Sequence, residues 1–391
     1  MKNRKIHLRA VGVCKKNERI YFFNLTVKGV FYLDLCDYSV HFVHKFSCDE
    51  DREMSVTLSK SFIFGDKIYF FPGNGESIIR VYDIKNGQEE FIPIPQEEKD
   101  FAAMGFFQQN NKVYIVSYKY GFYVLDLQRQ QVCRDEEINS LFDSEMLYTN
   151  LISTDKDTIL IGKRGSNQLF EIDLCKKEII YCKRLKEDIK IDRLCYDGEK
   201  CWILPMGSTN IYELDRTENA IRTYVYDNVN NESEVIQPYW DMVFLEDEIL
   251  VLNCQMKNIV RINKDKKTIE NPIGFPEGFR LNDMRIAGWS ICAAHLILEN
   301  EVLIFTIRGN MLLIYDKAEK RLIGKEMLVE LDEVPQLRAV MEKDFLQQDI
   351  GVEDEDETVE VFMELLSRQE KKSLGLYKEG IGKRIFLNVN D

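Results

Sequence analysis

The feature that most restricts how this chain can fold is a strand-like segment that recurs seven times and has Asp or Asn as its fifth residue. In each repeat a short apolar run is followed by a polar hairpin and then by this segment. The seven segments are VFYLDL at Val30–Leu35, IRVYDI at Ile79–Ile84, FYVLDL at Phe122–Leu127, LFEIDL at Leu169–Leu174, IYELDR at Ile211–Arg216, IVRINK at Ile259–Lys264 and LLIYDK at Leu312–Lys317. From Asp34 to Asp316 six intervals span 282 residues, a mean of 47, which is the size of a repeat that forms one small sheet.

Each repeat divides into four strand-like segments. In the second repeat, Ser61–Phe64 and Ile68–Phe71 precede the segment that holds Asp83, and the Asn86–Gly87 turn leads to a fourth segment, EEFIPI. Asn-Gly between strand-like runs is a strong hairpin signal. The chain is therefore predicted to be all-β, a seven-bladed β-propeller of four-stranded blades over residues 5–328. Six blades plus an irregular element is the alternative.

Two further expectations concern the innermost strands and the recurring Asp or Asn. Inner strands are predicted at 8–13, 61–64, 103–107, 148–152, 192–196, 239–244 and 290–296. The recurring residue is expected to cap the turn that follows it, because a catalytic carboxylate would not occur in every repeat.

The segment NQLFEIDLCKKEI at Asn167–Ile179 resembles the repeat of many bacterial β-propellers, and the resemblance extends over residues 5–328. The architecture it implies is that of kelch and WD40 repeat proteins. The paired glycines of kelch repeats and the Gly-His dipeptides of WD40 repeats are missing, and Trp-Asp occurs once, at Trp240–Asp241, rather than in each repeat. The resemblance therefore implies a repeat scaffold and transfers no functional residue.

Residues 329–391 form a predicted C-terminal helical extension. Pro335 can open one helix, Thr358 can cap a second after the acidic run 353–357, and Arg384–Val389 reads as a closing strand. The extension is expected to be a cap or a strand that zips the ring closed, with a partner-docking arm as the alternative.

Composition and charge restrict partners and compartment. The net charge is −14, and no basic stripe with interleaved aromatic residues occurs, so no nucleic-acid partner is expected. No run approaches the roughly 20 apolar residues of a spanning helix, and the N-terminus lacks signal-peptide features, so no membrane association is expected. Ten cysteines without a CxxC pair favour a reduced, cytoplasmic protein.

Motifs for catalysis and metal binding are missing. No GxSxG, HExxH, P-loop or EF-hand pattern occurs. His41 and His44 are spaced so that they lie on opposite faces of a strand, which disfavours a zinc site. No metal, cofactor or catalytic residue is therefore predicted.

The candidate binding residues lie near the starts of the inner strands, where a propeller's loops gather on one face around the central channel. They are Arg9, Lys60, Asp192, Arg193, Tyr239, Trp240, Asp241, Arg285 and Trp289. The long loops at Asp227–Pro238 and Asn271–Arg285 precede the two tryptophans, and long loops on a rigid frame often carry binding residues.

Two interpretations of these residues stay open. Arg193, Arg280 and Arg285 can recognise a carboxylate or phosphate, and Trp240 and Trp289 can stack on a sugar or an aromatic group. Alternatively, the tryptophans fill the channel entrance or the space between blades, and the arginines pair with Asp192, Asp241 and Asp283.

The function predicted from these observations is a non-enzymatic scaffold that presents its loop-rich face to a protein or peptide partner. One alternative is an enzyme acting on a carbohydrate or modified peptide, with Asp192, Asp241 or Asp283 as acid or base beside Tyr239 and Arg285. A small-molecule or glycan ligand is also compatible with the residues. A structural subunit of a larger assembly would instead carry an apolar patch on its sides or on its C-terminal helix.

Overall fold

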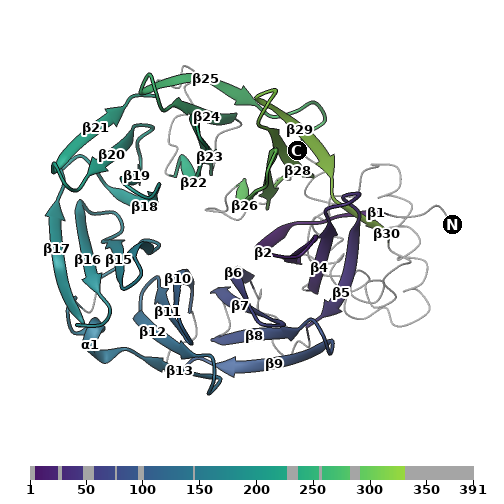
Figure 1. Cartoon of the computed structure of the whole chain (residues 1–391), viewed down its shortest axis with the longest axis horizontal. Helices are drawn as coiled ribbons and strands as arrows, with labels where there is room; N and C mark the ends of the chain where they lie inside the picture. The colour runs from purple at the N-terminus through teal and green to yellow at the C-terminus, as the bar shows by residue number, and fades with distance from the viewer. Residues whose placement is uncertain are drawn as a thin grey trace, which may run out of the picture. The chain divides into compact units, whose positions relative to one another are not determined.

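The computed structural model of the chain describes residues 5–24, 29–46, 57–74, 77–95, 101–143, 146–226, 237–254, 258–281 and 291–330. The chain divides into two units, one formed by Leu8–Met327 and the other by Met1–His7 with Leu328–Asp391. The first unit contains seven antiparallel sheets of four consecutive strands each. Figure 1 shows these sheets arranged as blades in a ring. The predicted all-β, seven-bladed propeller is confirmed.

The first four blades follow one another along the chain. Blade 1 holds β2 (Ala10–Lys16), β3 (Arg19–Asn24), β4 (Gly29–Asp34) and β5 (Val40–Lys45). Blade 2 holds β6 (Thr57–Phe64), β7 (Lys67–Asn74), β8 (Ile78–Asp83) and β9 (Gln88–Pro93). Blade 3 holds β10 (Ala103–Gln109), β11 (Lys112–Ser117), β12 (Gly121–Asp126) and β13 (Gln131–Arg134), after which comes α1 (Glu136–Asn139). Blade 4 holds β14 (Ile152–Asp155), β15 (Thr158–Gly162), β16 (Gln168–Asp173) and β17 (Glu178–Arg184).

The last three blades repeat the same order. Blade 5 holds β18 (Ile191–Tyr196), β19 (Cys201–Pro205), β20 (Ile211–Asp215) and β21 (Ala220–Tyr224). Blade 6 holds β22 (Tyr239–Phe244), β23 (Glu248–Asn253), β24 (Asn258–Asn263) and β25 (Thr268–Gly274). Blade 7 holds β26 (Cys292–Ile297), β27 (Glu301–Thr306), β28 (Met311–Asp316) and β29 (Arg321–Glu326). In every blade the first strand lies nearest the ring axis and the fourth lies on the outside (Figure 1).

The inner strand of blade 4 differs from its prediction. It begins at Ile152 rather than at Tyr148, which forms only an isolated bridge to Lys163. The reason is local hydrogen bonding, because the Thr149 hydroxyl accepts a hydrogen bond from the Gly162 backbone N–H at 2.9 Å. The side-chain amide of Asn150 bonds the backbone of Leu194 in blade 5 through both its oxygen and its nitrogen.

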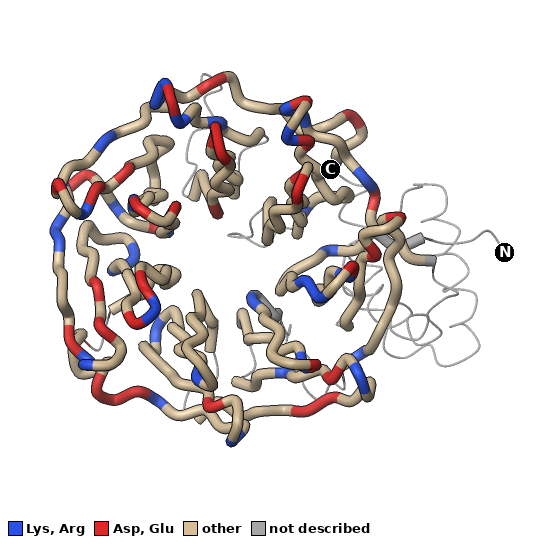
Figure 2. The backbone as a smooth tube through the Cα atoms, viewed as in Figure 1, with Lys and Arg blue, Asp and Glu red and all other residues tan. Residues whose placement is uncertain are grey.

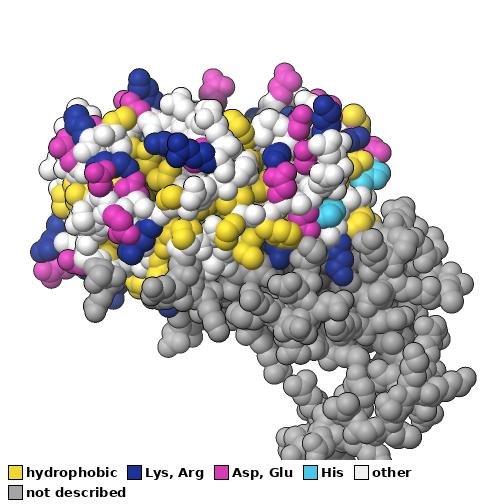
Figure 3. Space-filling model, turned by 90° about the horizontal axis from the view of Figure 1, so that it is seen from below, with side chains coloured by type: hydrophobic (Ala, Val, Ile, Leu, Met, Phe, Trp, Pro, Cys, Tyr) yellow, Lys and Arg dark blue, Asp and Glu magenta, His cyan; other side chains and the backbone are white. Residues whose placement is uncertain are grey.

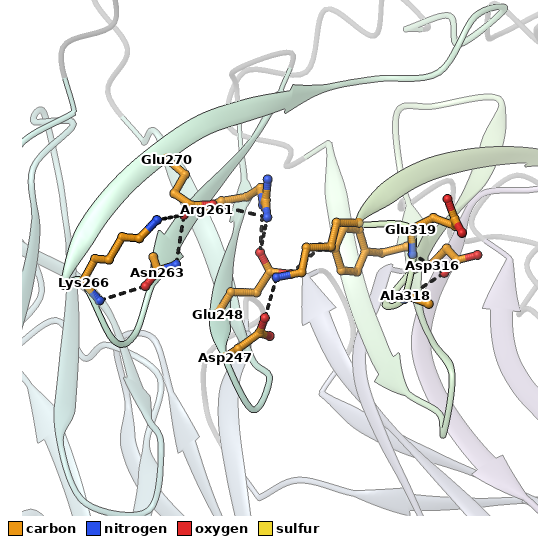
Figure 4. Close-up of polar contacts among 11 residues, drawn as sticks. Asp247, Glu248, Arg261, Asn263, Lys266, Glu270, Asp316, Ala318 and Glu319 are labelled. Atoms are coloured by element: carbon orange, nitrogen blue, oxygen red, sulfur yellow. Dashed lines mark hydrogen bonds and ion pairs between the residues drawn. The ribbon is translucent and has the colours of Figure 1, made fainter.

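The third strand of every blade ends at the predicted Asp or Asn, and that residue caps the next turn. Its side-chain oxygen accepts hydrogen bonds from backbone N–H groups two or three residues further on. Asp126, for example, accepts from Gln128 at 2.9 Å and from Arg129 at 3.0 Å, and such bonds lower the pKa of its carboxyl. Figure 4 shows Asn263 and Asp316 in this role.

Four residues after each capping residue, the backbone takes a left-handed conformation. The φ angle at these seven positions lies between 51° and 69°. The residues are Tyr38, Gly87, Gln130, Lys177, Asn219, Lys267 and Lys320. Only one of them is glycine, so six blades hold a side chain in a conformation that disfavours one.

Neighbouring blades pack through apolar side chains and some polar bridges. Between blades 6 and 7, Glu248 is 2% exposed and accepts hydrogen bonds from Arg261 at 2.8 Å and from the Tyr315 hydroxyl. Figure 4 shows Arg261 between Glu248 and Glu270. This buried carboxylate is therefore paired, which offsets the cost of removing its charge from water.

Side-chain contacts and a backbone hydrogen bond join the last blade to the first. The rings of Phe22 and Phe305 are fully buried, with centroids 6.2 Å apart. The Tyr38 hydroxyl donates a hydrogen bond to Glu301, and the backbone N–H of Leu8 donates to the oxygen of Met327 at 3.0 Å. Because each described blade consists of consecutive strands, these contacts close the ring without an exchanged strand among the described residues.

The other unit is described only where β1 (Lys5–His7) pairs with β30 (Leu328–Glu330) in an antiparallel sheet. The predicted helical extension and the predicted strand at Arg384–Val389 lie outside the described residues. The division into 5–328 and 329–391 therefore stays a prediction. No helix in the described part of the chain has the length and apolar character needed to cross a membrane.

Replacing Lys267 with Gly is expected to stabilise the propeller by about 0.5–1 kcal/mol. Glycine removes the cost of a left-handed side-chain-bearing residue, and the gain exceeds the entropy that glycine adds to the unfolded chain. Lys267 is exposed, so little packing is lost. Urea unfolding measures the change. Asp265→Gly, in the same turn but without a positive φ, should destabilise; equal effects of the two substitutions would contradict the explanation.

Candidate binding site at the inner strands

Five inner strands share a β-bulge, and most of the predicted binding residues lie at it. In these strands one residue has no partner in the ladder with the second strand. These unpaired residues are Ser59 in β6, Met104 in β10, Asp192 in β18, Trp240 in β22 and Ala293 in β26. A bulge bends the strand and redirects side chains. Lys60, Arg193 and Asp241 directly follow bulge residues, so five of the nine predicted residues lie at equivalent positions of three blades.

Arg193 and Trp240 connect blades 5, 6 and 7. The guanidinium carbon of Arg193 lies 3.6 Å from the centroid of the Trp240 ring, which is a cation–π contact. The indole Nε1 of Trp240 donates a hydrogen bond to the backbone oxygen of Ala293 at 3.0 Å. Arg193 is only 7% exposed, and burial lowers its pKa, yet a guanidinium stays charged in proteins. Its buried Nε has no hydrogen-bond partner among the described residues.

Asp192 is part of a closed ion pair. It is 2% exposed, and its Oδ1 accepts hydrogen bonds from Arg164 Nε at 2.6 Å and from Gln237 Nε2 at 3.2 Å. The face of Arg164 lies over the ring of Tyr118, with 5.1 Å from the guanidinium carbon to the centroid. Sequence reasoning missed Arg164, which lies in the loop between β15 and β16.

Asp241 is the solvent-accessible acidic group of the site, with 34% of its side chain exposed. Its Oδ2 lies 3.4 Å from Nδ1 of His295, an ion-pair distance rather than a well-formed hydrogen bond. Cys195 Sγ donates to its Oδ1 at 3.5 Å. Burial alone would raise the pKa of Asp241, but His295 and Lys60 outweigh it and hold the pKa below the usual value. Asp241 is therefore a carboxylate at neutral pH.

Lys60 brings a second positive charge to the site. It belongs to blade 2, far in sequence from Arg193 and Asp241. Burial lowers the pKa of its ammonium, Asp241 raises it and Arg193 lowers it. These mutual effects place Lys60, Arg193 and Asp241 in one electrostatic environment. No hydrogen bond or ion pair joins the Lys60 ammonium to any residue in the described ranges.

The remaining predicted residues separate into three groups. Tyr239 is buried in the core, where its hydroxyl donates to the backbone oxygen of Thr209 at 2.5 Å. Arg9 is also buried, and burial lowers its pKa. Arg285 and Trp289 lie outside the described residues, as does most of the loop at 227–238. The structure thus brings together Lys60, Asp192, Arg193, Trp240 and Asp241.

A separate pocket of about 860 Å³ lies between blades 3 and 4. Its lining includes Tyr114, Cys133, Asp135, Cys175 and Lys177, and Lys177 forms an ion pair with Asp135. None of the predicted binding residues lines it. In the described ranges, no group of three or more His, Cys, Asp or Glu residues is arranged to hold a metal ion.

Comparisons with known proteins identify the fold and no family. No protein-family model matches the chain, and no curated protein matches it. A streptogramin B lyase is similar with a TM-score of 0.57 and 14% identity, over 78% of this chain and 92% of that one. Virginiamycin B lyase from Staphylococcus aureus gives 0.56 and 11%, over 78% and 96%. A chain of the mitotic checkpoint complex gives 0.54 and 10%, over 80% and 93%.

Thiol alkylation should divide the cysteines by their place in the blades. Cys36, Cys133, Cys175 and Cys182 are exposed, whereas Cys14, Cys195, Cys201, Cys254 and Cys292 are buried. Burial raises the pKa of Cys14, Cys201 and Cys292 to about 12, so these thiols stay neutral as well as covered. Of these nine cysteines, iodoacetamide at pH 8 should modify the exposed four alone, as peptide mass spectrometry would show. Fast labelling of Cys195 would contradict the site geometry.

Replacing Asp241 with Asn should lower the pKa of Lys60, because the amide no longer favours the ammonium. Each unit of decrease raises the fraction of neutral, reactive amine about tenfold. Acetylation of Lys60 by acetic anhydride should therefore become faster, as measured by peptide mass spectrometry. Lys67, which pairs with Glu90 at 2.7 Å, is the internal control. Equal acceleration at both lysines, or none at Lys60, would refute the coupling.

Proposed function

We propose that this seven-bladed propeller is a non-enzymatic binding scaffold whose inner strands in blades 5 to 7 contact a protein or peptide partner. The observation that carries the proposal is the buried guanidinium of Arg193, stacked on Trp240 at 3.6 Å with its Nε lacking a hydrogen-bond partner. Tryptophan and arginine are the residues in which binding energy is most often concentrated. A rigid frame that presents them suits recognition.

The described acidic residues favour binding over glycosidic chemistry. Such chemistry needs two carboxyl groups beside the scissile bond. Asp192 is 2% exposed and is occupied by Arg164, which leaves Asp241 as the accessible one of the two described candidates. The lyases among the structural neighbours are too distant in sequence for their activity to be transferred.

The outer surface also favours a binding scaffold over a purely structural subunit. In the described ranges, the large apolar side chains that are exposed belong to different strands or turns, namely Phe91, Leu147, Ile180, Val225, Ile297 and Ile323. Figure 3 shows apolar side chains interspersed with acidic and basic ones on one side of the molecule, and Figure 2 shows charged residues all around the ring. Single exposed apolar residues are ordinary.

The proposed compartment is the cytoplasm. Nine cysteines in the described ranges are free, which suits a reducing environment. The partner is proposed to be a protein or peptide, with a glycan or small molecule as the other possible occupant of the same residues.

Trp240→Ala should abolish recovery of a specific partner. The tagged full-length chain is used as bait in a lysate of the cells that produce it, beside the variant and beside Ile180→Ser, which changes an exposed side chain on β17. Loss of a central tryptophan is expected to cost about 2 kcal/mol or more, a weakening of more than tenfold. Circular dichroism checks that both variants fold.

A partner that the wild type and Ile180→Ser recover and Trp240→Ala does not would support the proposal. Equal recovery by a folded Trp240→Ala variant would refute this face as the binding surface. A partner lost only with Ile180→Ser would move the interface to the outer strands.

A further inference from the structure

The guanidinium of Arg193 is held in place but not neutralised. One of its faces is covered by Trp240 at 3.6 Å, and Trp240 is fixed by its hydrogen bond to Ala293. The side chain is only 7% exposed, and its Nε is buried without an acceptor. No acidic side chain in the described ranges lies within ion-pair distance of it. An arginine so deeply buried is normally paired.

Lys60 is a second cation in the same environment. It follows a bulge in β6 as Arg193 follows one in β18, so equivalent turns of the backbone place both residues on the innermost strands. Burial and Arg193 lower the pKa of its ammonium, and Asp241 opposes them. Arginine supplies a planar fork that matches an oxyanion, and lysine supplies a compact charge.

The charges of Lys60, Arg164, Asp192, Arg193 and Asp241 sum to one positive charge in excess. Arg164 neutralises Asp192 at 2.6 Å. The carboxylate of Asp241 balances one of the two cations Lys60 and Arg193, and it also lies 3.4 Å from His295. A bound monoanion would neutralise the remaining positive charge. A dianionic phosphate would make the net charge negative and would be repelled by Asp241.

We propose that Lys60 and Arg193 bind a carboxylate group of the partner at the inner strands. This inference rests on the proposed binding function and adds the chemistry that anchors the partner. The carboxylate belongs either to an acidic side chain or to the C-terminus of a peptide. Trp240 fixes the guanidinium by covering one of its faces.

Fluorine NMR of the full chain labelled with 5-fluorotryptophan tests this directly. The three tryptophans, Trp202, Trp240 and Trp289, give three signals that single Trp→Phe variants assign. N-acetyl-aspartate amide represents an acidic side chain, and N-acetyl-alanine represents a C-terminus. Chloride and phosphate at equal ionic strength are the controls. The carboxylates should shift the Trp240 signal saturably and leave the signal of Trp202 unchanged, because Trp202 is bound to Asp197 at 2.8 Å within its own blade.

Lys60→Gln and Arg193→Gln should each weaken the carboxylate response at least tenfold. Lys67→Gln, which changes the neighbouring strand β7, should leave the response intact. Because Trp240 stacks on Arg193 and has no cation–π contact with Lys60 among the described residues, Lys60→Gln remains informative even if Arg193→Gln disturbs the indole. The stronger of the two carboxylate probes identifies the source of the group.

Four results would overturn the inference: no response to carboxylates, an equal response to chloride, a stronger response to phosphate, or an unchanged response in Lys60→Gln or Arg193→Gln. These outcomes are separate from the proposed function. If partner recovery depends on Trp240 but carboxylates cause no shift, only the carboxylate inference fails. If carboxylates bind but no partner depends on Trp240, the anchoring chemistry holds and the protein-binding function fails.

Discussion

The fold depends most on one hydrogen-bonded turn, which follows the third strand of every blade. A side-chain oxygen accepts backbone N–H groups just beyond the strand, and the chain then passes through a left-handed residue before the fourth strand begins. This geometry fixes where each outer strand pairs, and so it fixes the width of the blade. Sevenfold repetition of the turn gives seven sheets of equal breadth, which can pack face to face around one axis.

Because all seven blades share this turn, the residues of their inner strands can differ from blade to blade. Four strands already bury the faces of each blade, so a bulge next to the axis disturbs only the pairing with one neighbour. Blades 5 and 6 use this freedom to carry Asp192 with Arg193 and Trp240 with Asp241, while blade 3 carries Met104 and Gly105 at the same positions. The residues of the proposed binding site thus lie in a few blades, although the architecture is shared by all of them.

The sequence predicted the repeated elements well, because period, polar hairpins and the capping residue recur and support one another. It predicted the grouping of Lys60, Asp192, Arg193, Trp240 and Asp241 only from their place near strand starts. The bulges that align these residues could not be recognised from the alternation of apolar and polar residues along a strand. Arg164 escaped notice because its partner Asp192 is 28 residues away. The inner strand of blade 4 was misplaced because Thr149 and Asn150 bond through side chains. Tyr239 lies near a strand start, as predicted, but its side chain is buried in the core.

Closure of the ring by noncovalent contacts has a consequence for how the chain could be connected. Leu8 and Met327, the ends of the propeller unit, are hydrogen-bonded to one another, and the junction of Phe22 with Phe305 is an aromatic contact between blades like the others in the ring. The starting blade is therefore arbitrary in physical terms. Circular permutation, with the old ends linked and a new opening made between any two blades, would retain every sheet intact.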